Sequence, residues 1–365
     1  MIQVPRTTVA AVLNNKIKGL EVREIPVPSL YSDEILVDAT AASINAVDYY
    51  HIDQNWSPDG SVFGIAVSGK VLKVGEDVSR FKPGDFIASF IHGGDYTSPA
   101  KGAYSKIAVV QEVYSIKVNL LQLGSLDYIA SSEVKTFEGA CSLVNTLVTM
   151  GVSLFHTLGG SFDEPQDKSF LIYGGSTATG LIATQVAKIF GWRVISIASK
   201  KHKNLMKGFG ADFLVDYHDA DFVQQVRAID ADITIALHTV GGETTLRSVI
   251  DCVSDSLPTK IDSLIVKDFA HLESLKSNVS YTMTRAFTAN GRDVVYSNGD
   301  TYPAPAGIKE STTVFLSQME KLINKYTLKH IPILVHPGGL SSINEAHKII
   351  RSGGISGAKL VIRID

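Results

Sequence analysis

The segment LIYGGSTATGLI, residues 171–182, has the outline of a loop that binds the phosphates of a dinucleotide. An apolar run leads into glycines and an apolar helical stretch follows, which would aim helix N–H groups at an anion. The G-x-G-x-x-G spacing is broken, because Gly175 and Gly180 are in place but Thr177 replaces the middle glycine. Hydroxyl donors for phosphate oxygens are available at Ser176, Thr177 and Thr179. An ordinary strand–helix turn with small residues for packing is the alternative.

The residues after the second strand of this pattern indicate which dinucleotide would bind. An NAD site usually places Asp or Glu there to bind the ribose hydroxyls. Here the strand ends at Ser199, and the basic run KKHK at residues 200–203 follows directly. Three lysines suit a 2′-phosphate, and the helix dipole disfavours basic residues at a helix start unless an anion is bound. With Tyr217 flanking the adenine end, the sequence predicts NADP (NADPH) over NAD; a solvated basic turn is the alternative.

The elements that must position this loop alternate between strand and helix. Gly191 and Gly210 fall where helices are expected to stop, and Asp219 or Asp221 can cap the third helix. Such alternation predicts βαβ units and a parallel sheet. The expected strands are residues 169–174, 192–198, 212–217 and 232–237, and the expected helices are residues 179–191, 200–210 and 219–229.

The rest of the chain has a different rhythm. Residues 1–135 contain short apolar runs separated by Gly- and Pro-rich turns, which indicate a small β barrel or sandwich. Residues 138–158 space their apolar residues like a helix and are expected to bridge into a second domain. From about residue 312 the tail has two helical stretches, each followed by an apolar, strand-like run.

Composition narrows the function classes. A chain of 365 residues with 45% apolar residues is typical of a compact enzyme with two domains. Its net charge of −3 predicts neither a nucleic-acid nor an anionic-membrane partner. We find no signal peptide and no apolar run of about 18 residues, so a soluble, cytoplasmic protein is expected. Cys141 and Cys252 lack zinc spacing and are expected to pack as small hydrophobic residues.

Several segments in this order resemble the zinc-free, quinone-oxidoreductase-like branch of the medium-chain dehydrogenases/reductases, over nearly the whole chain. They are ASINAVDYYHID, FGIAVSGKVLKVGEDVSRFKPGDFI, GAYSKIAVV, YGGSTATG and GFGADFLVDYHDAD. The sequence is most similar to fungal NADPH- or NADH-dependent aldehyde and quinone reductases. It also resembles the trans-acting enoyl reductases of lovastatin-type polyketide pathways, where a Ser-Thr-Ala loop replaces the usual glycines.

The resemblance implies an α/β fold with two domains. A GroES-like, β-rich catalytic domain would comprise residues 1–137, with residues 312–365 returning to it. A Rossmann domain with a doubly wound parallel sheet would occupy residues 138–311, and the active site would lie where the domains meet.

The resemblance also assigns cofactor contacts position by position. The phosphate loop would be Gly175, Ser176, Thr177, Ala178 and Thr179. The 2′-phosphate and adenine ends would be held by Ser199, by His202 or Lys203, and by Tyr217. The nicotinamide half and the ribose would be approached by Thr149, His238, Thr239, Phe287 and Thr288. The match at Thr149 is weaker, because this chain has SLVNTLVTMG where the family often has Leu-Pro and Thr-Ala.

Two departures bear on the chemistry. Zinc-dependent relatives carry Cys and a His-Glu pair in segments where this chain has SINAVDYY and FGIAVSG, so no metal is expected. Without a metal, a protein donor would help to supply the proton. Tyr50 matches an active-site tyrosine of some quinone oxidoreductases, with an ordinary lining aromatic as the alternative. Asn45 could hydrogen-bond a substrate oxygen or the cofactor, whereas Asp48 is expected to cap the local helix. His51 and His92 are weaker candidates.

Three functions follow as hypotheses. The first is an NADPH-dependent, zinc-independent oxidoreductase that transfers hydride to activated carbonyls, quinones or aldehydes. The second is an enoyl reductase acting on acyl thioesters, and the third is a non-catalytic NADPH-binding regulatory protein. The expected partner is a small-molecule carbonyl or quinone, and a homodimer could form through the edge strand at residues 279–287.

Overall fold

The computed structural model describes residues 4–163 and 166–364, which form two compact units. The first unit runs up to Val148 and resumes at Phe287, and the second unit is Thr149–Ala286. The sequence analysis placed the junctions at 137/138 and 311/312 instead. At the first junction, the chain passes from one unit to the other inside helix α2 (Phe137–Met150) and not at its start. At the second junction, the segment from Phe287 onward already packs with the first unit.

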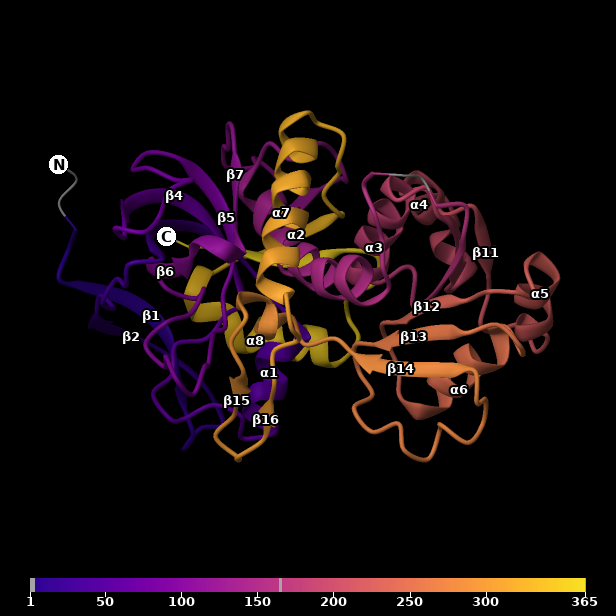
Figure 1. Cartoon of the computed structure of the whole chain (residues 1–365). Coiled ribbons are helices and arrows are strands. Elements are labelled where there is room, and N and C mark those ends of the chain that lie inside the picture. The colour runs from indigo at the N-terminus through magenta and orange to yellow at the C-terminus, as the bar shows by residue number, and fades with distance from the viewer. Residues whose placement is uncertain (1–3, 164–165, 365) are drawn as a thin grey trace. The chain divides into compact units, whose positions relative to one another are not determined.

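The first unit is built on a curled, mostly antiparallel sheet (Figure 1). Its strand order is β7-β5-β4-β3-β18-β17-β8, and β6 also pairs with β3. Two register shifts in the pairing of β3 with β4 bend the sheet. Along β3, the first part pairs with β6 and the last part pairs with β18. The strands are β3 Glu34–Ser43, β4 Ala66–Val74, β5 Phe86–Phe90, β6 Ile107–Gln111, β7 Ser115–Val118, β8 Tyr128–Ile129, β17 Ile333–His336 and β18 Lys359–Arg363.

Hairpins and helices complete the first unit. The hairpins are β1 Thr7–Asn14 with β2 Gly19–Pro26, and β15 Val294–Val295 with β16 Thr301–Tyr302. The helices are α1 Ala46–Asp53, α2 Phe137–Met150, α7 Ile308–Asn324 and α8 Ile343–Arg351. Helix α1 packs against α8, and α7 packs against β7. The N- and C-terminal parts of the chain therefore share one core.

Helix α2 continues as a π-helical segment, Gly151–Thr157, in the second unit. The combined helix, Phe137–Thr157, is long and apolar enough to cross a membrane, a run that the sequence analysis did not anticipate. However, 78% of its apolar window is buried, and the core helix of a soluble protein passes the same length and composition test. The helix is explained by packing alone.

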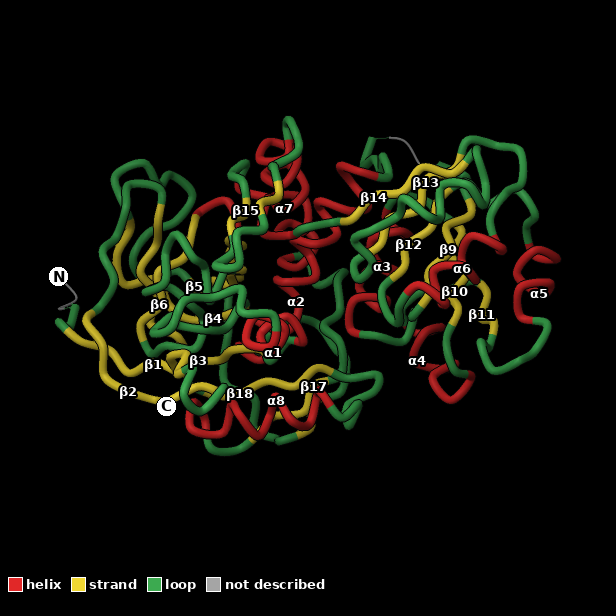
Figure 2. The backbone as a smooth tube through the Cα atoms, turned by 90° about the horizontal axis from the view of Figure 1, so that it is seen from below, coloured by secondary structure: helices red, strands yellow, loops and turns green. Residues whose placement is uncertain are grey.

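The second unit is a parallel sheet of order β11-β10-β9-β12-β13-β14, and Figure 2 shows the strands in this sequence. The strands are β9 Ser169–Tyr173, β10 Arg193–Ile197, β11 Phe213–Val215, β12 Ile235–His238, β13 Thr259–Ser263 and β14 Val279–Met283. The helices are α3 Ala178–Ile189, α4 Lys203–Gly208, α5 Phe222–Ile229 and α6 Glu243–Cys252. Right-handed crossovers place α3 and α4 on one face and the packed pair α5 and α6 on the other. The predicted doubly wound α/β fold is confirmed.

The strand order of this sheet reverses between β9 and β12. The chain runs from β9 to β10 and β11, then crosses back to β12 on the other side of β9. In open parallel sheets, ligands bind beyond the carboxyl ends of the strands at such a reversal. The predicted phosphate loop follows β9 directly and therefore lies at this point.

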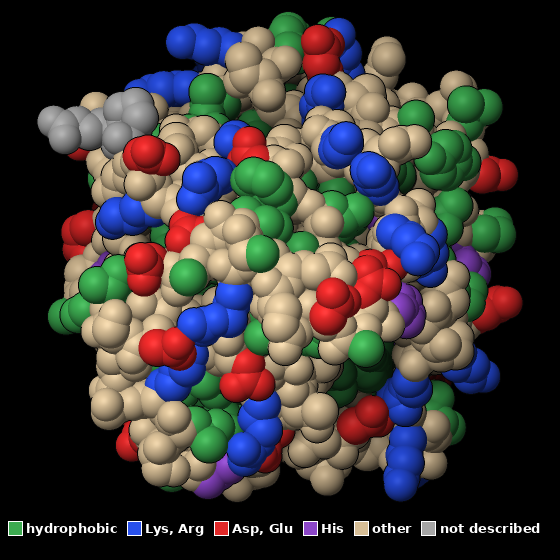
Figure 3. Space-filling model, turned by 90° about the vertical axis from the view of Figure 1, so that its right-hand side faces the viewer, with side chains coloured by type: hydrophobic (Ala, Val, Ile, Leu, Met, Phe, Trp, Pro, Cys, Tyr) green, Lys and Arg blue, Asp and Glu red, His purple; other side chains and the backbone are tan. Residues whose placement is uncertain are grey.

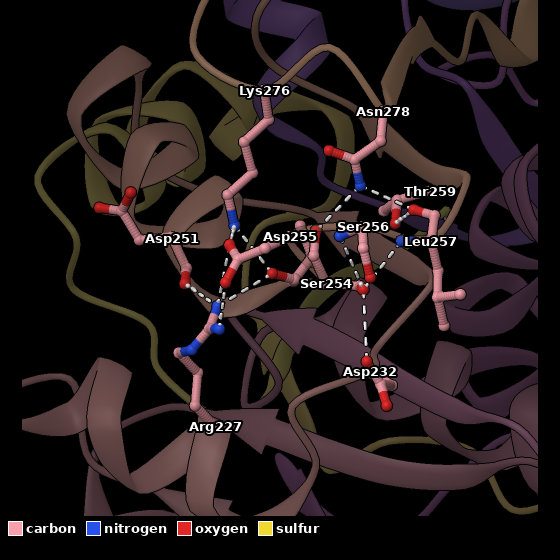
Figure 4. Close-up of polar contacts among 11 residues, drawn as sticks. Arg227, Asp232, Asp251, Ser254, Asp255, Ser256, Leu257, Thr259, Lys276 and Asn278 are labelled. Carbon is pink, nitrogen blue, oxygen red and sulfur yellow. Dashed lines mark hydrogen bonds and ion pairs between the residues drawn. The ribbon is translucent and has the colours of Figure 1, made fainter.

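A polar network lies at the amino ends of the strands, in the connection that precedes β13 (Figure 4). The carboxylate of Asp255 accepts hydrogen bonds from Arg227 and Lys276. The Asn278 amide donates to the backbone oxygens of Ser254, at 3.0 Å, and Leu257, at 2.7 Å. This network holds the connection between α6 and β13, and we interpret it as structural.

The surface of the second unit carries charges of both signs. Figure 3 shows Lys and Arg side chains interspersed with Asp and Glu on the face in view. Several form ion pairs, including Lys188 with Asp212 and Arg193 with Asp230. Because several charges on this surface are paired, lysines without a carboxylate partner are candidates for binding an anion.

Candidate functional site

The glycines of the predicted phosphate loop are required because a larger residue would clash with neighbouring atoms. A Cβ at Gly175 would lie 1.7 Å from the Ser196 Oγ, and a Cβ at Gly180 would lie 2.4 Å from the Gly174 backbone oxygen. Gly174 itself has a φ of +89°, in the left-handed region that favours glycine. The loop therefore packs tightly against the β10 strand and the start of α3, as a dinucleotide loop does.

The hydroxyls of this loop have two different roles. Thr177 caps α3, because its Oγ1 accepts the Gly180 N–H at 3.0 Å and donates to the Gly174 oxygen at 2.8 Å. In contrast, the half-buried hydroxyls of Ser176 and Thr179 have no partner within residues 4–163 and 166–364. These two hydroxyls, with the backbone N–H groups at the start of α3 that Thr177 does not engage, remain available to an anion.

The basic run begins directly after β10. Ser199 precedes a short 3-10 turn, Lys200–His202, that leads into α4. In the described part of the chain, none of the ammonium groups of Lys200, Lys201 and Lys203 has a carboxylate partner. Burial and the neighbouring Lys201 lower the pKa of His202, so its ring is neutral at physiological pH. Three positive charges without a carboxylate partner among the described residues therefore lie where the sequence analysis expected a 2′-phosphate.

One carboxylate near this run was missed from the sequence. Asp216, at the end of β11, accepts the Lys200 backbone N–H at 2.9 Å and contacts the His218 Nδ1 at 2.6 Å. Burial acts to raise the pKa of Asp216, but the hydrogen bonds from Lys200 and His218 outweigh it and bring the pKa to about 2. The carboxylate is anionic and shapes the turn. Its position in VDYH was visible, but its proximity to residue 200 depends on parallel pairing of β10 with β11.

Three other predicted cofactor residues also lie at the carboxyl ends of the strands. The Tyr217 side chain is 43% exposed, and its ring centroid is 6.4 Å from that of Tyr173 at the end of β9. His238 is fully buried between Ser263 and Thr245, and burial lowers its pKa to about 4. The Thr239 hydroxyl donates to the Tyr173 oxygen at 2.9 Å. Tyr217 is therefore accessible to an adenine, whereas His238 and Thr239 are engaged within the unit.

The remaining predicted cofactor residues are not in this group. Thr149 is in the last turn of α2, where the second unit begins. Phe287 and Thr288 begin the returning part of the first unit, and both are buried. The Phe287 ring stacks on His92 at 3.8 Å between centroids and on Phe90 at 5.2 Å.

The two predicted catalytic residues flank the start of α1 in the first unit. The Tyr50 side chain is 43% exposed, with its ring 4.7 Å from that of Tyr49. Asn45 is only 4% exposed, and its amide nitrogen donates to the Ser43 oxygen at 2.9 Å. Its amide oxygen accepts from the Asn145 amide and the Lys359 ammonium. Tyr50 can reach a ligand, whereas both ends of the Asn45 amide are occupied by the protein.

Lys359 belongs to a buried polar network that the sequence analysis did not anticipate. Asp48 accepts the Asn45 backbone N–H at 2.9 Å, the predicted cap, and the Tyr104 hydroxyl at 2.6 Å. Burial raises the pKa of Asp48 to about 7, and burial lowers the pKa of Lys359 to about 8. A lysine that opens an apolar strand carries no local signal of such a role.

We expect Asp48→Asn to flatten the pH dependence of stability. The unfolded chain releases the Asp48 proton near pH 3.8 and the folded chain near pH 7, so the folded state binds more protons in between. The free energy of unfolding therefore falls with rising pH across this window, by up to about 4 kcal/mol from this group. Urea unfolding at pH 4.5 and 7.5 would measure the loss of that fall. Parallel pH profiles for the two proteins would contradict the assignment.

Of the weaker candidates, His51 is a core residue, whereas His92 is half-buried and lines a pocket. His51 is 1% exposed, accompanied by Trp56 and Phe63, and its Nδ1 lies 3.0 Å from the Ser57 Oγ. Burial lowers the pKa of His92 to about 3, so this histidine is neutral.

The cysteines do not form part of a metal site among the described residues. Cys141 and Cys252 are buried and free, which confirms that they pack as small hydrophobic residues. Among the described residues, no group of three or more His, Cys, Asp or Glu side chains could hold a metal ion.

The structure combines a curled β unit with a Rossmann unit. Models of protein families match both parts. The model described as alcohol dehydrogenase GroES-like domain matches residues 31–119, and the one described as zinc-binding dehydrogenase matches residues 178–256.

Relatives extend the match over the whole chain. An uncharacterized protein of Saccharomyces cerevisiae is 33% identical over 98% of each chain. A trans-enoyl reductase of Alternaria alternata is 28% identical over 95% of this chain and 96% of its own. The solved structure of a quinone oxidoreductase from Coxiella burnetii has a TM-score of 0.69 at 22% identity, over 98% of this chain and 100% of its own. The chain belongs to the medium-chain dehydrogenase/reductase family, of the quinone-oxidoreductase type, whose members bind NAD or NADP.

Proposed function

We propose that the protein is an NADPH-dependent, zinc-independent reductase of activated carbonyls, quinones or aldehydes. The observation that carries this proposal is the set of three lysines after Ser199, none with a carboxylate partner in the described chain. Lysine ammonium groups are strong phosphate binders, and their mutual repulsion is relieved when a dianion is bound. A 2′-phosphate is the feature that distinguishes NADPH from NADH.

The cofactor fits the loop geometry, because Gly174, Gly175 and Gly180 leave no room for a Cβ beside the phosphate-binding turn. Bound NADPH would supply the hydride. Ser176 and Thr179 would hold the phosphates, and Tyr217 would flank the adenine. The exposed Tyr50 phenol is the proposed proton donor, since Asn45 is occupied by Lys359 and Asn145. We further propose a homodimer through β14, which is an edge strand of its sheet.

A second candidate function is enoyl thioester reduction. Similarity to a trans-enoyl reductase over nearly the whole chain favours it. The chemistry is closely related, because hydride reaches an activated carbon and a proton completes the product. The two candidates differ in substrate and not in cofactor.

A spectrophotometric screen tests both candidates. NADPH and NADH oxidation at 340 nm would be followed with quinones, aldehydes, enones and enoyl thioesters, after NADPH binding has been measured separately. We expect turnover with NADPH, and preference for enoyl thioesters over quinones would select the second candidate. Confirmed NADPH binding without turnover of any substrate would favour a non-catalytic, regulatory role.

A further inference from the structure

A second concave site lies on the first unit, and none of its lining residues belongs to the site proposed above. It is a pocket of about 310 Å³ between the tip of the β1–β2 hairpin, the end of α1 and helix α8. We call it the basic pocket, and its polar lining is Lys18, Asn344, His347, Lys348 and Arg351. The volume lies at the lower end of the range of small-molecule sites, about 300–1,000 Å³.

The walls of the basic pocket are fixed by hydrogen bonds. The Asn344 amide on α8 accepts the Leu20 backbone N–H at 2.9 Å and donates to the Leu20 oxygen at 2.7 Å. Gly19 permits this approach, because a Cβ there would lie 3.1 Å from the Asn344 Oδ1. The hairpin is thus clamped to α8, although some 320 residues separate them in the chain. The pocket is a built feature of the fold.

Positive charge is concentrated at this pocket. Lys18 and Lys348 are exposed and have no carboxylate partner in the described part of the chain. The third cation, Arg351, is held in place by Asp53 at 3.0 Å and lies over the Tyr49 ring at 4.8 Å. Three cations therefore face one carboxylate, in a protein whose net charge is −3. Like charges that line one pocket repel one another, and an anion bound between them would relieve this repulsion.

Two further features characterise the lining of the basic pocket. Lys18 has a φ of +47°, a left-handed conformation that glycine or asparagine adopts at lower cost. His347 is 5% exposed, and its buried Nε2 has no hydrogen-bond partner among the described residues. Burial, together with Arg351, lowers the pKa of His347 to about 4, so the ring is a neutral wall of the pocket. The lysine thus occupies a strained turn position and contributes its charge to the pocket.

We propose that the basic pocket binds a phosphate group. The Arg351 guanidinium offers the fork geometry that suits phosphate oxygens, and Lys18 and Lys348 add point charges on either side. The pocket volume exceeds that of the ion alone, which leaves room for the organic part of a phosphate monoester. This site is independent of the hydride chemistry, because it shares no residue with the NADPH site proposed in the second unit.

Titration calorimetry tests the site with defined probes. The measurements use the full chain carrying Lys200→Gln and Lys203→Gln, which removes the competing phosphate contacts of the NADPH site. The probes are inorganic phosphate, 4′-phosphopantetheine and pantetheine. We expect saturable binding of both phosphate probes and none of pantetheine. Tighter binding of phosphopantetheine than of inorganic phosphate would identify a phosphate ester as the ligand, and equal binding would identify the free ion.

Matched substitutions assign the binding to the basic pocket. Adding Lys18→Gln and Lys348→Gln should weaken binding of both phosphate probes at least tenfold without changing the melting temperature, because both side chains are exposed. Adding Lys82→Gln and Lys325→Gln, two exposed lysines elsewhere in the first unit, should change the affinity less than twofold. Equal effects of the two pairs, or the absence of saturable binding, would overturn the proposal.

Discussion

A variant carrying Lys200→Glu and Lys203→Glu is expected to lose its preference for NADPH by about 100-fold or more. Hydrogen bonds to charged groups contribute about 1.5–3 kcal/mol each, and every 1.4 kcal/mol corresponds to a factor of ten. The substitutions remove two cations and introduce two carboxylates that repel a 2′-phosphate but accept hydrogen bonds from ribose hydroxyls. The measurement is the ratio of kcat/KM with NADPH to kcat/KM with NADH.

NADH is an internal control, because it shares every contact except those of the 2′-phosphate. A second control carries Lys168→Glu and Lys260→Glu, which impose the same change of net charge on exposed lysines at the amino ends of β9 and β13. This control should leave the cofactor ratio within about threefold of the unsubstituted protein, since exposed charges more than a Debye length apart are screened. An unchanged ratio in the test variant would show that the 2′-phosphate site is wrongly placed.

Arg363→Met is expected to destabilise the first unit by about 3–5 kcal/mol. The Glu138 carboxylate is fully buried at the start of α2, and the Arg363 Nε donates to it at 2.6 Å. Arg363 also donates to the backbone oxygens of Gly124 and Leu126. Removing the guanidinium leaves a buried charge whose remaining donor is the Gly124 N–H. Urea unfolding followed by circular dichroism measures the loss.

A double-mutant cycle separates the ion pair from the packing of the arginine. Glu138→Gln combined with Arg363→Met removes the uncompensated charge and should recover at least 1 kcal/mol relative to Arg363→Met alone. Additive destabilisation by the two substitutions would show that the pair is not coupled, and would contradict its placement.

Much of the second unit could be predicted from the sequence. The alternation of strand and helix, the stop signals at Gly191 and Gly210, and the glycines around residue 175 are local patterns. They act through backbone geometry and hydrophobic periodicity, which neighbouring residues determine. The family resemblance rested on short segments of both units and was confirmed. The substrate remains a proposal, because the exposed residues that would select it, such as Tyr50, have no local pattern.

Tertiary structure decided how the polar groups are used. Asn45 was predicted to meet a ligand, but packing brings it to Lys359, 314 residues away, and both ends of its amide are occupied.

The sequence by itself determined the two-domain α/β class, the glycines after β9 and the run of lysines, because each depends on short-range propensity and residue type. Folding decided that Asp216 lies beside residue 200, that half-buried Lys359 reaches Asn45 next to buried Asp48, and that Lys18 lies at helix α8. These contacts join distant segments, and their desolvation and charge depend on the completed core.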